Sequence, residues 1–175
     1  MKTLIIAEAG VNHNGSLARA QKMVSVAAEA GADLVKFQSF ITDKSISRQA
    51  PKAQYQKGGT DPAESQFDMV RKLELSKGDH DELVAECRRR GIGFFSTAFD
   101  FDSLEMLLGL GLSIVKIPSG EITNLPFLRH VGRLGKDVLL STGMATLGEI
   151  EAAIDVLERA GTPRTRMTVL HCTTE

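Results

Sequence analysis

The stretch I-V-K-I-P-S-G-E-I-T-N, residues Ile114–Asn124, decides the fold, because it combines an apolar strand with polar residues at the strand's end. Its apolar, β-branched start favours a strand, and the proline and glycine that follow end it. Lys116 lies inside the strand and must face a cavity or be buried with a partner, because an unpaired ammonium group out of water is costly. Ser119 and Glu121 come next, so a cation, a hydroxyl and a carboxylate converge as around an anionic ligand. The alternative is a snorkelling edge-strand lysine beside an ordinary turn.

The same device, an apolar run followed by polar residues, recurs along the chain. The predicted strands are Leu4–Ala7, Leu34–Gln38, Gly93–Thr97, Ile114–Ile117, Val138–Ser141 and Met167–His171. Helical spacing of apolar residues predicts the helices Leu17–Ala30, Phe67–Leu75, Asp79–Arg90, Phe101–Leu110, Leu125–Leu134 and Leu147–Ala160. Because the strands are continuously apolar and alternate with helices, the pattern indicates an α/β fold with a parallel sheet buried on both faces.

Two architectures fit this alternation, a doubly wound open sheet and a (β/α)8 TIM barrel. No G-x-G-x-x-G fingerprint follows the first strand, and polar residues end every strand, as in a barrel whose active site gathers side chains from many strand ends. The sequence therefore favours the barrel. Eight strands need about 250 residues, so we expect residues 1–175 to be a barrel truncated after its sixth strand, or one that recruits its missing wall from another copy.

Composition indicates a soluble globular protein of 175 residues, with 42% hydrophobic and 25% charged residues. The net charge of −1 disfavours binding to nucleic acid or to an anionic membrane. No apolar run is long enough for a signal sequence or a membrane span. Cys87 and Cys172 lack metal or redox spacing, which is typical of reduced cytosolic thiols. We therefore expect a cytoplasmic location.

Several residues outside the strand ends receive structural interpretations. His13 is expected to brace a turn in its Asn/Gly loop, and His80 and His130 are expected on the surface. His171 either lines the site or packs in the barrel, and Cys172 is expected to be a buried, inert thiol. The polar segment Ile41–Gln66 is either a lid or a decoration.

Six motifs, in this order and each at a strand end, resemble the sialic acid synthases, which include the N-acetylneuraminate, legionaminate and pseudaminate synthases. They are I-A-E-A-G-V-N-H-N-G (Ile6–Gly15), G-A-D-L-V-K-F-Q (Gly31–Gln38), F-F-S-T-A-F (Phe94–Phe99), V-K-I-P-S-G-E (Val115–Glu121), L-S-T-G-M (Leu140–Met144) and L-H-C-T-T-E (Leu170–Glu175).

The resemblance implies a TIM barrel followed by a small antifreeze-like domain, in a domain-swapped homodimer. Such enzymes are transferases that condense phosphoenolpyruvate with an N-acetylated amino-sugar aldehyde and release phosphate, in carbohydrate biosynthesis. They use a divalent metal, Mn²⁺ or Mg²⁺, to polarise the aldehyde. The metal-binding histidines, a tyrosine and a sugar-binding arginine of the family all correspond to positions past Glu175, so no metal ligand is expected in this chain.

By motif match, the resemblance assigns the site residues. The catalytic set is Glu121, Lys116 and Glu8, and the substrate-binding set is Lys36, Gln38, Thr97, Lys116, Ser119 and Thr174. Thr174 stands where some members of the family have asparagine. Segment 41–66 corresponds to a variable loop on the sugar side, where Tyr55 and Gln56 are candidates for sugar contacts.

The residue types fit this chemistry. Two lysines from separate strands can neutralise the phosphate and the carboxylate of phosphoenolpyruvate. Glu121 can stabilise positive charge at C2 of the donor and activate the water that adds there. Two alternatives stay open. Lys36 or Lys116 could instead be the nucleophile of a Schiff-base aldolase, and the chain could be a catalytically incomplete fragment that binds only phosphate or phosphoenolpyruvate.

Overall fold

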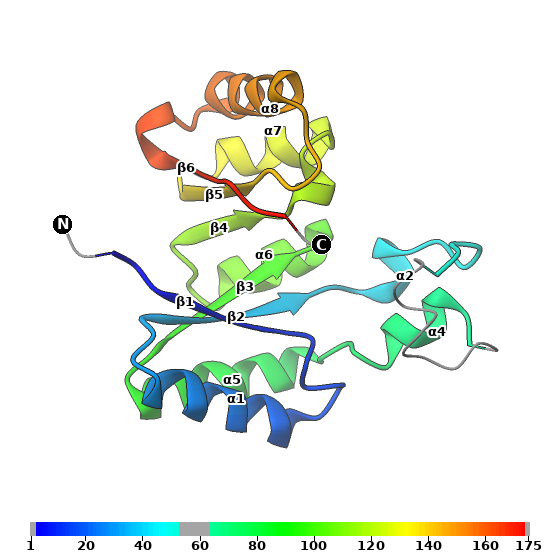
Figure 1. Ribbon diagram of the computed structural model, residues 1–175, viewed down its shortest axis with the longest axis vertical. Coiled ribbons are helices and arrows are strands. Elements are labelled where there is room, and N and C mark those ends of the chain that lie inside the picture. Colours follow the sequence, from blue (N-terminus) through cyan, green and yellow to red (C-terminus); the bar gives the residue numbers. More distant parts are fainter. Residues whose placement is uncertain (1–2, 53–63, 174–175) are drawn as a thin grey trace. The chain divides into compact units, whose positions relative to one another are not determined.

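The computed structural model describes residues 3–52 and 64–173 (Figure 1). The chain forms two compact units, Met1–Met106 and Leu107–Glu175. The first contains β1 (Ile6–Gly10), α1 (Leu17–Glu29), β2 (Leu34–Ser39), α2 (Thr42–Ser45), α4 (Gln66–Arg71), α5 (Lys77–Arg90) and β3 (Gly93–Ala98). Then come α6 (Phe101–Gly109), β4 (Ile114–Ile117), the 3-10 turn η1 (Ser119–Glu121), α7 (Leu125–Arg133), β5 (Asp137–Ser141), α8 (Leu147–Ala160), η2 (Arg164–Arg166) and β6 (Met167–Leu170).

In the first unit, β1 pairs with β2 and β2 with β3, all parallel. The register places Glu8 opposite Lys36 and Gln38 opposite Thr97. Helices α1 and α5 pack side by side on one face of these strands (Figure 1). A buried apolar cluster fills the space between, made of Ala9, Ala20, Val24, Ala27, Val35, Phe37, Leu75, Leu83, Cys87 and Ile92. Polar side chains on the opposite face of the strands are therefore free to build a site.

In the second unit, β4 pairs with β5 and β5 with β6, again parallel. Helices α7 and α8 pack against each other (Figure 1). Their close approach depends on Gly132, because a Cβ there would lie 2.5 Å from Cβ of Ala160 and 2.9 Å from the carbonyl oxygen of Leu157. Phe127 and Val131 of α7 and Leu140 of β5 are buried in this unit.

Local capping fixes where the helices begin. Ser76 and Asp79 form a reciprocal capping box at the start of α5, and Thr146 and Glu149 form one at the start of α8. Helix α5 ends at Gly91, whose φ of +69° is the left-handed conformation that glycine adopts most readily. These helix boundaries therefore set the lengths of the loops between the strands and the helices.

The alternation of strands and helices and the parallel pairings confirm the predicted α/β class. Two of the larger differences from the prediction are boundaries, and a third is an element that was not predicted. The first strand runs over Ile6–Gly10 rather than Leu4–Ala7, because pairing with β2 starts at Ile6 and the two preceding apolar residues are half-exposed. Helix α4 ends at Arg71 rather than at Leu75, because the next two turns close with tighter i→i−3 bonds. The described part of segment 41–66 includes a helical turn, α2, which the sequence did not indicate.

Candidate active site

Lys36 is at the centre of the first cluster of polar side chains. It forms an ion pair with Glu8 of β1, and its Nζ donates to Oγ1 of Thr97 in β3 at 3.5 Å. The lysine side chain is only 14% exposed, whereas that of Glu8 is 51% exposed. The register of three parallel strands thus brings a largely buried cation, a carboxylate and a hydroxyl together, as the strand-end pattern predicted.

Gln38 belongs to the same cluster because of an irregularity in β1. The register of β1 shifts between Glu8 and Gly10, where the backbone turns left-handed with φ of +54°. A Cβ at Gly10 would lie 3.2 Å from Oε1 of Glu8 and 3.7 Å from Nε2 of Gln38. Both side chains therefore lie beside this glycine.

Lys116 is at the centre of the second cluster and is buried, with 7% of its surface exposed. Its Nζ donates to Oγ of Ser141 at 2.6 Å and to the carbonyl oxygen of Ile117 at 3.0 Å. The prediction of a buried, partnered lysine is confirmed, and the snorkelling alternative is wrong. Ser141 was not among the predicted site residues, although it is the first polar residue after the apolar run of β5. Since Leu139 pairs with Lys116, a residue two positions further along β5 is well placed to meet the lysine tip.

Ser119 opens the 3-10 turn η1 and faces the β5–α8 loop. A Cβ at Gly143 would lie 3.3 Å from Oγ of Ser119 and 3.5 Å from the carbonyl oxygen of Cys172. The end of β4, the loop after β5 and the second residue after β6 therefore meet within this unit. Because glycine leaves this space open, Ser119 can direct its hydroxyl toward a small ligand.

The prediction that Cys172 is a buried thiol is wrong, because Cys172 is exposed. Burial acts to raise the pKa of the Cys172 thiol, but the Ser141 hydroxyl, the backbone N–H groups of Thr142 and Gly143 and the charge of Lys116 together lower the pKa below its usual value. Two of these groups, Ser141 and Lys116, form the centre of the second cluster. The lowered pKa of the thiol therefore indicates that this cluster is electropositive.

Glu121 lies at the end of η1, where its carboxylate accepts a bond from Nδ2 of Asn124 at 2.5 Å. Asn124 in turn caps α7 by accepting from the backbone N–H of Phe127. The catalytic role of Glu121 stays a prediction. Thr174 lies outside the described residues, as do Tyr55 and Gln56. Lys36 and Lys116 belong to different compact units, and their use by one ligand also stays a prediction.

The predicted histidine roles have mixed outcomes. His13 does brace a turn, since its Nδ1 accepts from the backbone N–H of Gly15 at 3.0 Å. Burial is the main cause of its lowered pKa. The surface position predicted for His80 is wrong, because only 1% of this residue is exposed. Among the described residues, no group of three or more His, Cys, Asp or Glu side chains is arranged to hold a metal ion.

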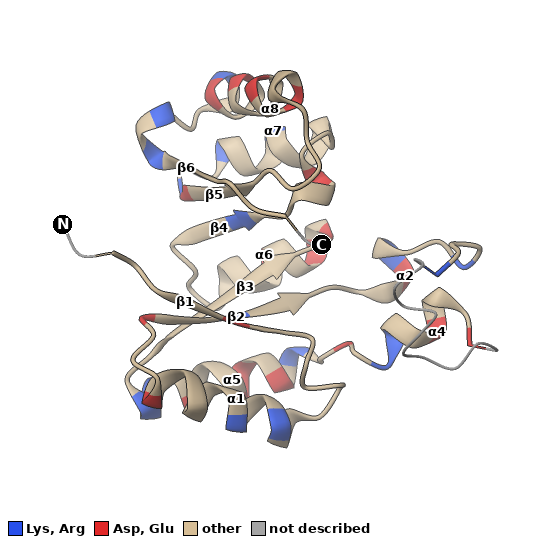
Figure 2. Ribbon diagram, in the orientation of Figure 1, with Lys and Arg blue, Asp and Glu red and all other residues tan. Residues whose placement is uncertain are grey.

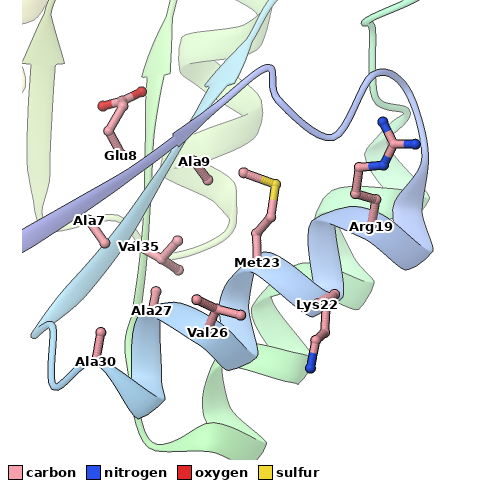
Figure 3. Close-up of a pocket in the computed structure, with 10 residues that line it drawn as sticks. All are labelled: Ala7, Glu8, Ala9, Arg19, Lys22, Met23, Val26, Ala27, Ala30 and Val35. Carbon is pink, nitrogen blue, oxygen red and sulfur yellow. The ribbon is translucent and has the colours of Figure 1, made fainter.

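A cavity of about 330 Å³ lies elsewhere in the first unit, between α1 and strands β1 and β2 (Figure 3). Figure 3 shows Met23, Val26 and Ala27 of α1 facing Val35 of β2, with the Glu8 carboxylate turned away from them. The lining is mostly apolar. This cavity therefore lies in the helix-facing layer and borders the Lys36 cluster at Glu8, which lines it. No helix in residues 3–52 or 64–173 is both long and apolar enough to cross a bilayer.

Comparison with known proteins places these clusters in context. The model of the NeuB family matches residues 23–175. The N,N'-diacetyllegionaminic acid synthase of Campylobacter jejuni is 56% identical over 174 residues, which cover 99% of this chain and 52% of that protein. The synthase of the same name from Legionella pneumophila is 43% identical, covering 99% of this chain and 49% of that protein. The chain thus spans about half the length of these curated relatives.

The fold is also shared with solved structures. An N-acetylneuraminic acid (sialic acid) synthetase from Leptospira borgpetersenii, crystallised with citrate, matches with a TM-score of 0.82 and 32% identity. The match covers 100% of this chain and 55% of that one. This likeness confirms the predicted TIM-barrel type of fold, of which residues 3–52 and 64–173 supply six strands.

Proposed function

The chain belongs to the NeuB family, the sialic acid synthases that its motifs resemble, and we propose that it serves the condensation of phosphoenolpyruvate with an N-acetylated amino-sugar aldehyde. The products would be a nine-carbon sialic-type acid and phosphate. The relatives are named as synthases of such acids. The donor, the acceptor class and the roles of individual residues are our proposal.

The observation that carries the proposal is the buried contact between Lys116 and Ser141. A buried ammonium group that donates to a hydroxyl at 2.6 Å, with Ser119 facing the neighbouring loop, is a donor set suited to a small anion. We assign the phosphate or carboxylate of phosphoenolpyruvate to this cluster. The lowered pKa of Cys172 supports the assignment, because the same groups favour a negative charge nearby.

The Lys36 cluster is assigned the second negative charge of the donor. In the ligand-free chain, Glu8 acts as the counter-ion of Lys36. Since the Glu8 side chain is half-exposed, it can swing away at little cost when a ligand carboxylate takes its place. Thr97 and Gln38 then supply directional hydrogen bonds to the ligand.

The proposed reaction forms one carbon–carbon bond between donor and acceptor and one carbon–oxygen bond from water to C2, and it breaks the bond between C2 and the phosphate oxygen. C3 of phosphoenolpyruvate attacks the aldehyde carbon, and the aldehyde oxygen takes up a proton. C2 of the donor becomes positively charged and adds water, and the resulting intermediate expels phosphate. Glu121 is assigned to stabilise the charge at C2 and to accept the proton of the water.

The family resemblance also predicts Mn²⁺ or Mg²⁺. The described residues do not form a cluster that fits such an ion, so no step is derived through it. A homodimer and a cytoplasmic location are likewise proposals. Light scattering of the purified chain tests the first and cell fractionation tests the second.

The proposal is tested by titrating the chain with phosphoenolpyruvate in a calorimeter and by measuring phosphate release with N-acetylmannosamine and Mn²⁺ present. Saturable binding with release supports the synthase function. Binding without release supports the alternative in which this chain only binds the donor. A borohydride-trapped adduct on Lys36 or Lys116 would show a Schiff-base aldolase instead, and no binding would overturn the proposal.

A further inference from the structure

Three buried side chains connect the strands of the first unit to helix α5. Oγ of Ser39, at the end of β2, lies 2.7 Å from Nε2 of His80 and 2.7 Å from Oγ of Ser96 in β3. Each of the three residues is 1% exposed. The ring of His80 also lies edge-on to Phe94, with 6.4 Å between the ring centroids. The network therefore has no access to solvent and a fixed ring orientation.

The direction of each hydrogen bond follows from the far side of the imidazole. Nδ1 of His80 lies 2.8 Å from the carbonyl oxygen of Ser76, which can only accept. Nδ1 must therefore carry the proton, which leaves Nε2 of the neutral ring as an acceptor. Ser39 donates its hydroxyl to Nε2, so its oxygen accepts the hydroxyl of Ser96. The chain of bonds runs from Ser96 through Ser39 to His80 and on to Ser76.

This network lies directly behind the Lys36 cluster. Successive side chains of a strand point to opposite faces, so Ser39 and Ser96 face the helix layer while their neighbours Gln38 and Thr97 face the other side. Gln38 and Thr97 are register partners. Figure 1 shows α5 packed along this part of the unit. The residues of the network, Ser39 and Ser96, are thus chain neighbours of the ligand-facing residues Gln38 and Thr97.

We propose that His80 is a positioning residue for the binding of phosphoenolpyruvate, acting through Ser39 and Ser96 on the ends of β2 and β3. This proposal rests on the proposed function of the Lys36 cluster. The acceptor at Nε2 fixes the Ser39 hydroxyl, and that hydroxyl in turn fixes Ser96, which precedes Thr97. Losing the acceptor leaves a buried hydroxyl without its partner, and the strand ends shift to satisfy it.

The charged surroundings of His80 are few. Burial lowers the pKa of His80 below its usual value and outweighs the hydrogen bond to Ser76 and the charges of Asp79 and Asp81, from its own helix, which favour the protonated ring. His13, from the β1–α1 loop, is the titratable neighbour from another element, and its charge would oppose that of His80. Ser39, Ser96 and Phe94 contribute no charge. The neutral ring that the network requires is thus the form present near pH 7.

Two substitutions of His80 distinguish the contributions of the two ring nitrogens. In His80→Gln, the side-chain oxygen can reach the position of Nε2, so the acceptor for Ser39 is kept and the bond to Ser76 is lost. In His80→Asn, the shorter amide can reach only the position of Nδ1, so the bond to Ser76 is kept and the acceptor is lost. A residue that only caps or fills α5 should favour Asn or show no difference, whereas a positioning residue should favour Gln.

The test measures the dissociation constant of phosphoenolpyruvate for each variant by calorimetry, alongside unfolding in urea. We expect His80→Asn to bind about tenfold more weakly than the wild type, and His80→Gln to recover most of the affinity. In a Ser39→Ala background the two variants should bind alike, because the link to the strands is gone. Equal affinity of both variants in the Ser39-containing chain would overturn the proposal.

Two further readouts keep the test decisive. Imidazole ¹⁵N spectra of the wild type should show His80 protonated at Nδ1 only, and a proton on Nε2 would contradict the network whatever the variants do. If the wild type does not bind phosphoenolpyruvate at all, the proposed function fails. If it binds and the Gln and Asn variants are indistinguishable, only the positioning role fails.

Discussion

Nζ of Lys116 in β4 lies 2.6 Å from Oγ of Ser141 in β5, so one hydrogen bond joins two neighbouring strand ends at the centre of the second polar cluster. The lysine is buried, and the serine follows the buried apolar run Val138–Leu140 at the end of β5. Figure 2 shows that basic residues occur on several helices as well, so charge alone does not single out Lys116. Its burial and its partner do.

Ser141→Ala is expected to weaken the binding of phosphoenolpyruvate by about tenfold, because it removes a hydroxyl that orients the ammonium group, and hydrogen bonds to charged groups contribute roughly 1.5–3 kcal/mol. Calorimetry measures the effect. Ser113→Ala, an exposed serine just before β4, is the matched control and should bind like the wild type. An unchanged affinity in Ser141→Ala would remove Ser141 from the site.

Glu8→Gln is expected to strengthen the binding of phosphoenolpyruvate about two- to fivefold, because the competing carboxylate of the Lys36 ion pair is removed. Stability should change by less than about 1 kcal/mol, since the Glu8 side chain is half-exposed. Glu82→Gln, on the exposed face of α5, changes net charge equally and serves as the control. Weaker binding in Glu8→Gln than in this control would mean that Glu8 assists binding instead of competing with it.

The two cysteines should differ sharply in reactivity. Burial raises the pKa of Cys87 to about 12, whereas Cys172 is exposed and has a lowered pKa. Iodoacetamide at pH 7.5 should therefore label Cys172 and leave Cys87 unlabelled until the chain is unfolded. Mass spectrometry identifies the site. Lys116→Met should slow the labelling of Cys172, and equal labelling of both thiols in the folded chain would contradict the described environment.

Stability should fall as the solution is acidified below pH 6.5. Burial lowers the pKa values of His13 and His80 below the usual 6.5, so the unfolded chain binds protons that the folded chain does not. Their contribution is complete above pH 6.5 and is lost as the pH falls toward the lowered pKa values. Urea unfolding between pH 7.5 and 5.5 measures this slope. His80→Gln should make the slope shallower, and an identical slope would show that His80 does not titrate in this range.

Gly132→Val should destabilise the chain by about 1–3 kcal/mol, because the new side chain meets Ala160 and the backbone of α8. Gly148→Ala, near the start of α8, is the control, since a Cβ there meets only Oγ1 of Thr146 at 4.0 Å. Thermal unfolding compares the two. A Gly132→Val chain as stable as the wild type would mean that α7 and α8 pack less closely than described.

Much of the fold followed from periodicity, and the reasons for the exceptions are physical. Because Lys116 lies within an apolar strand, it was predicted to be buried with a partner or to face a cavity, with a snorkelling lysine as the alternative. Ser141 was missed as a site residue, because only the register of β4 and β5 shows that it reaches the lysine. His80 was predicted on the surface because its position in a helix does not tell whether a strand packs against that side of the helix. Its buried hydrogen bonds depend on two serines that are distant in sequence.

The central proposal is that Lys36 and Lys116 hold the same molecule of phosphoenolpyruvate. Calorimetric titration of the wild type, Lys36→Met and Lys116→Met tests it most directly, with the exposed Lys22→Met as the control for charge. We predict one phosphoenolpyruvate bound per chain, with affinity lowered at least about tenfold in each of the two cluster variants and little changed in the control. Two molecules bound per chain, or wild-type affinity in either cluster variant, would contradict the account.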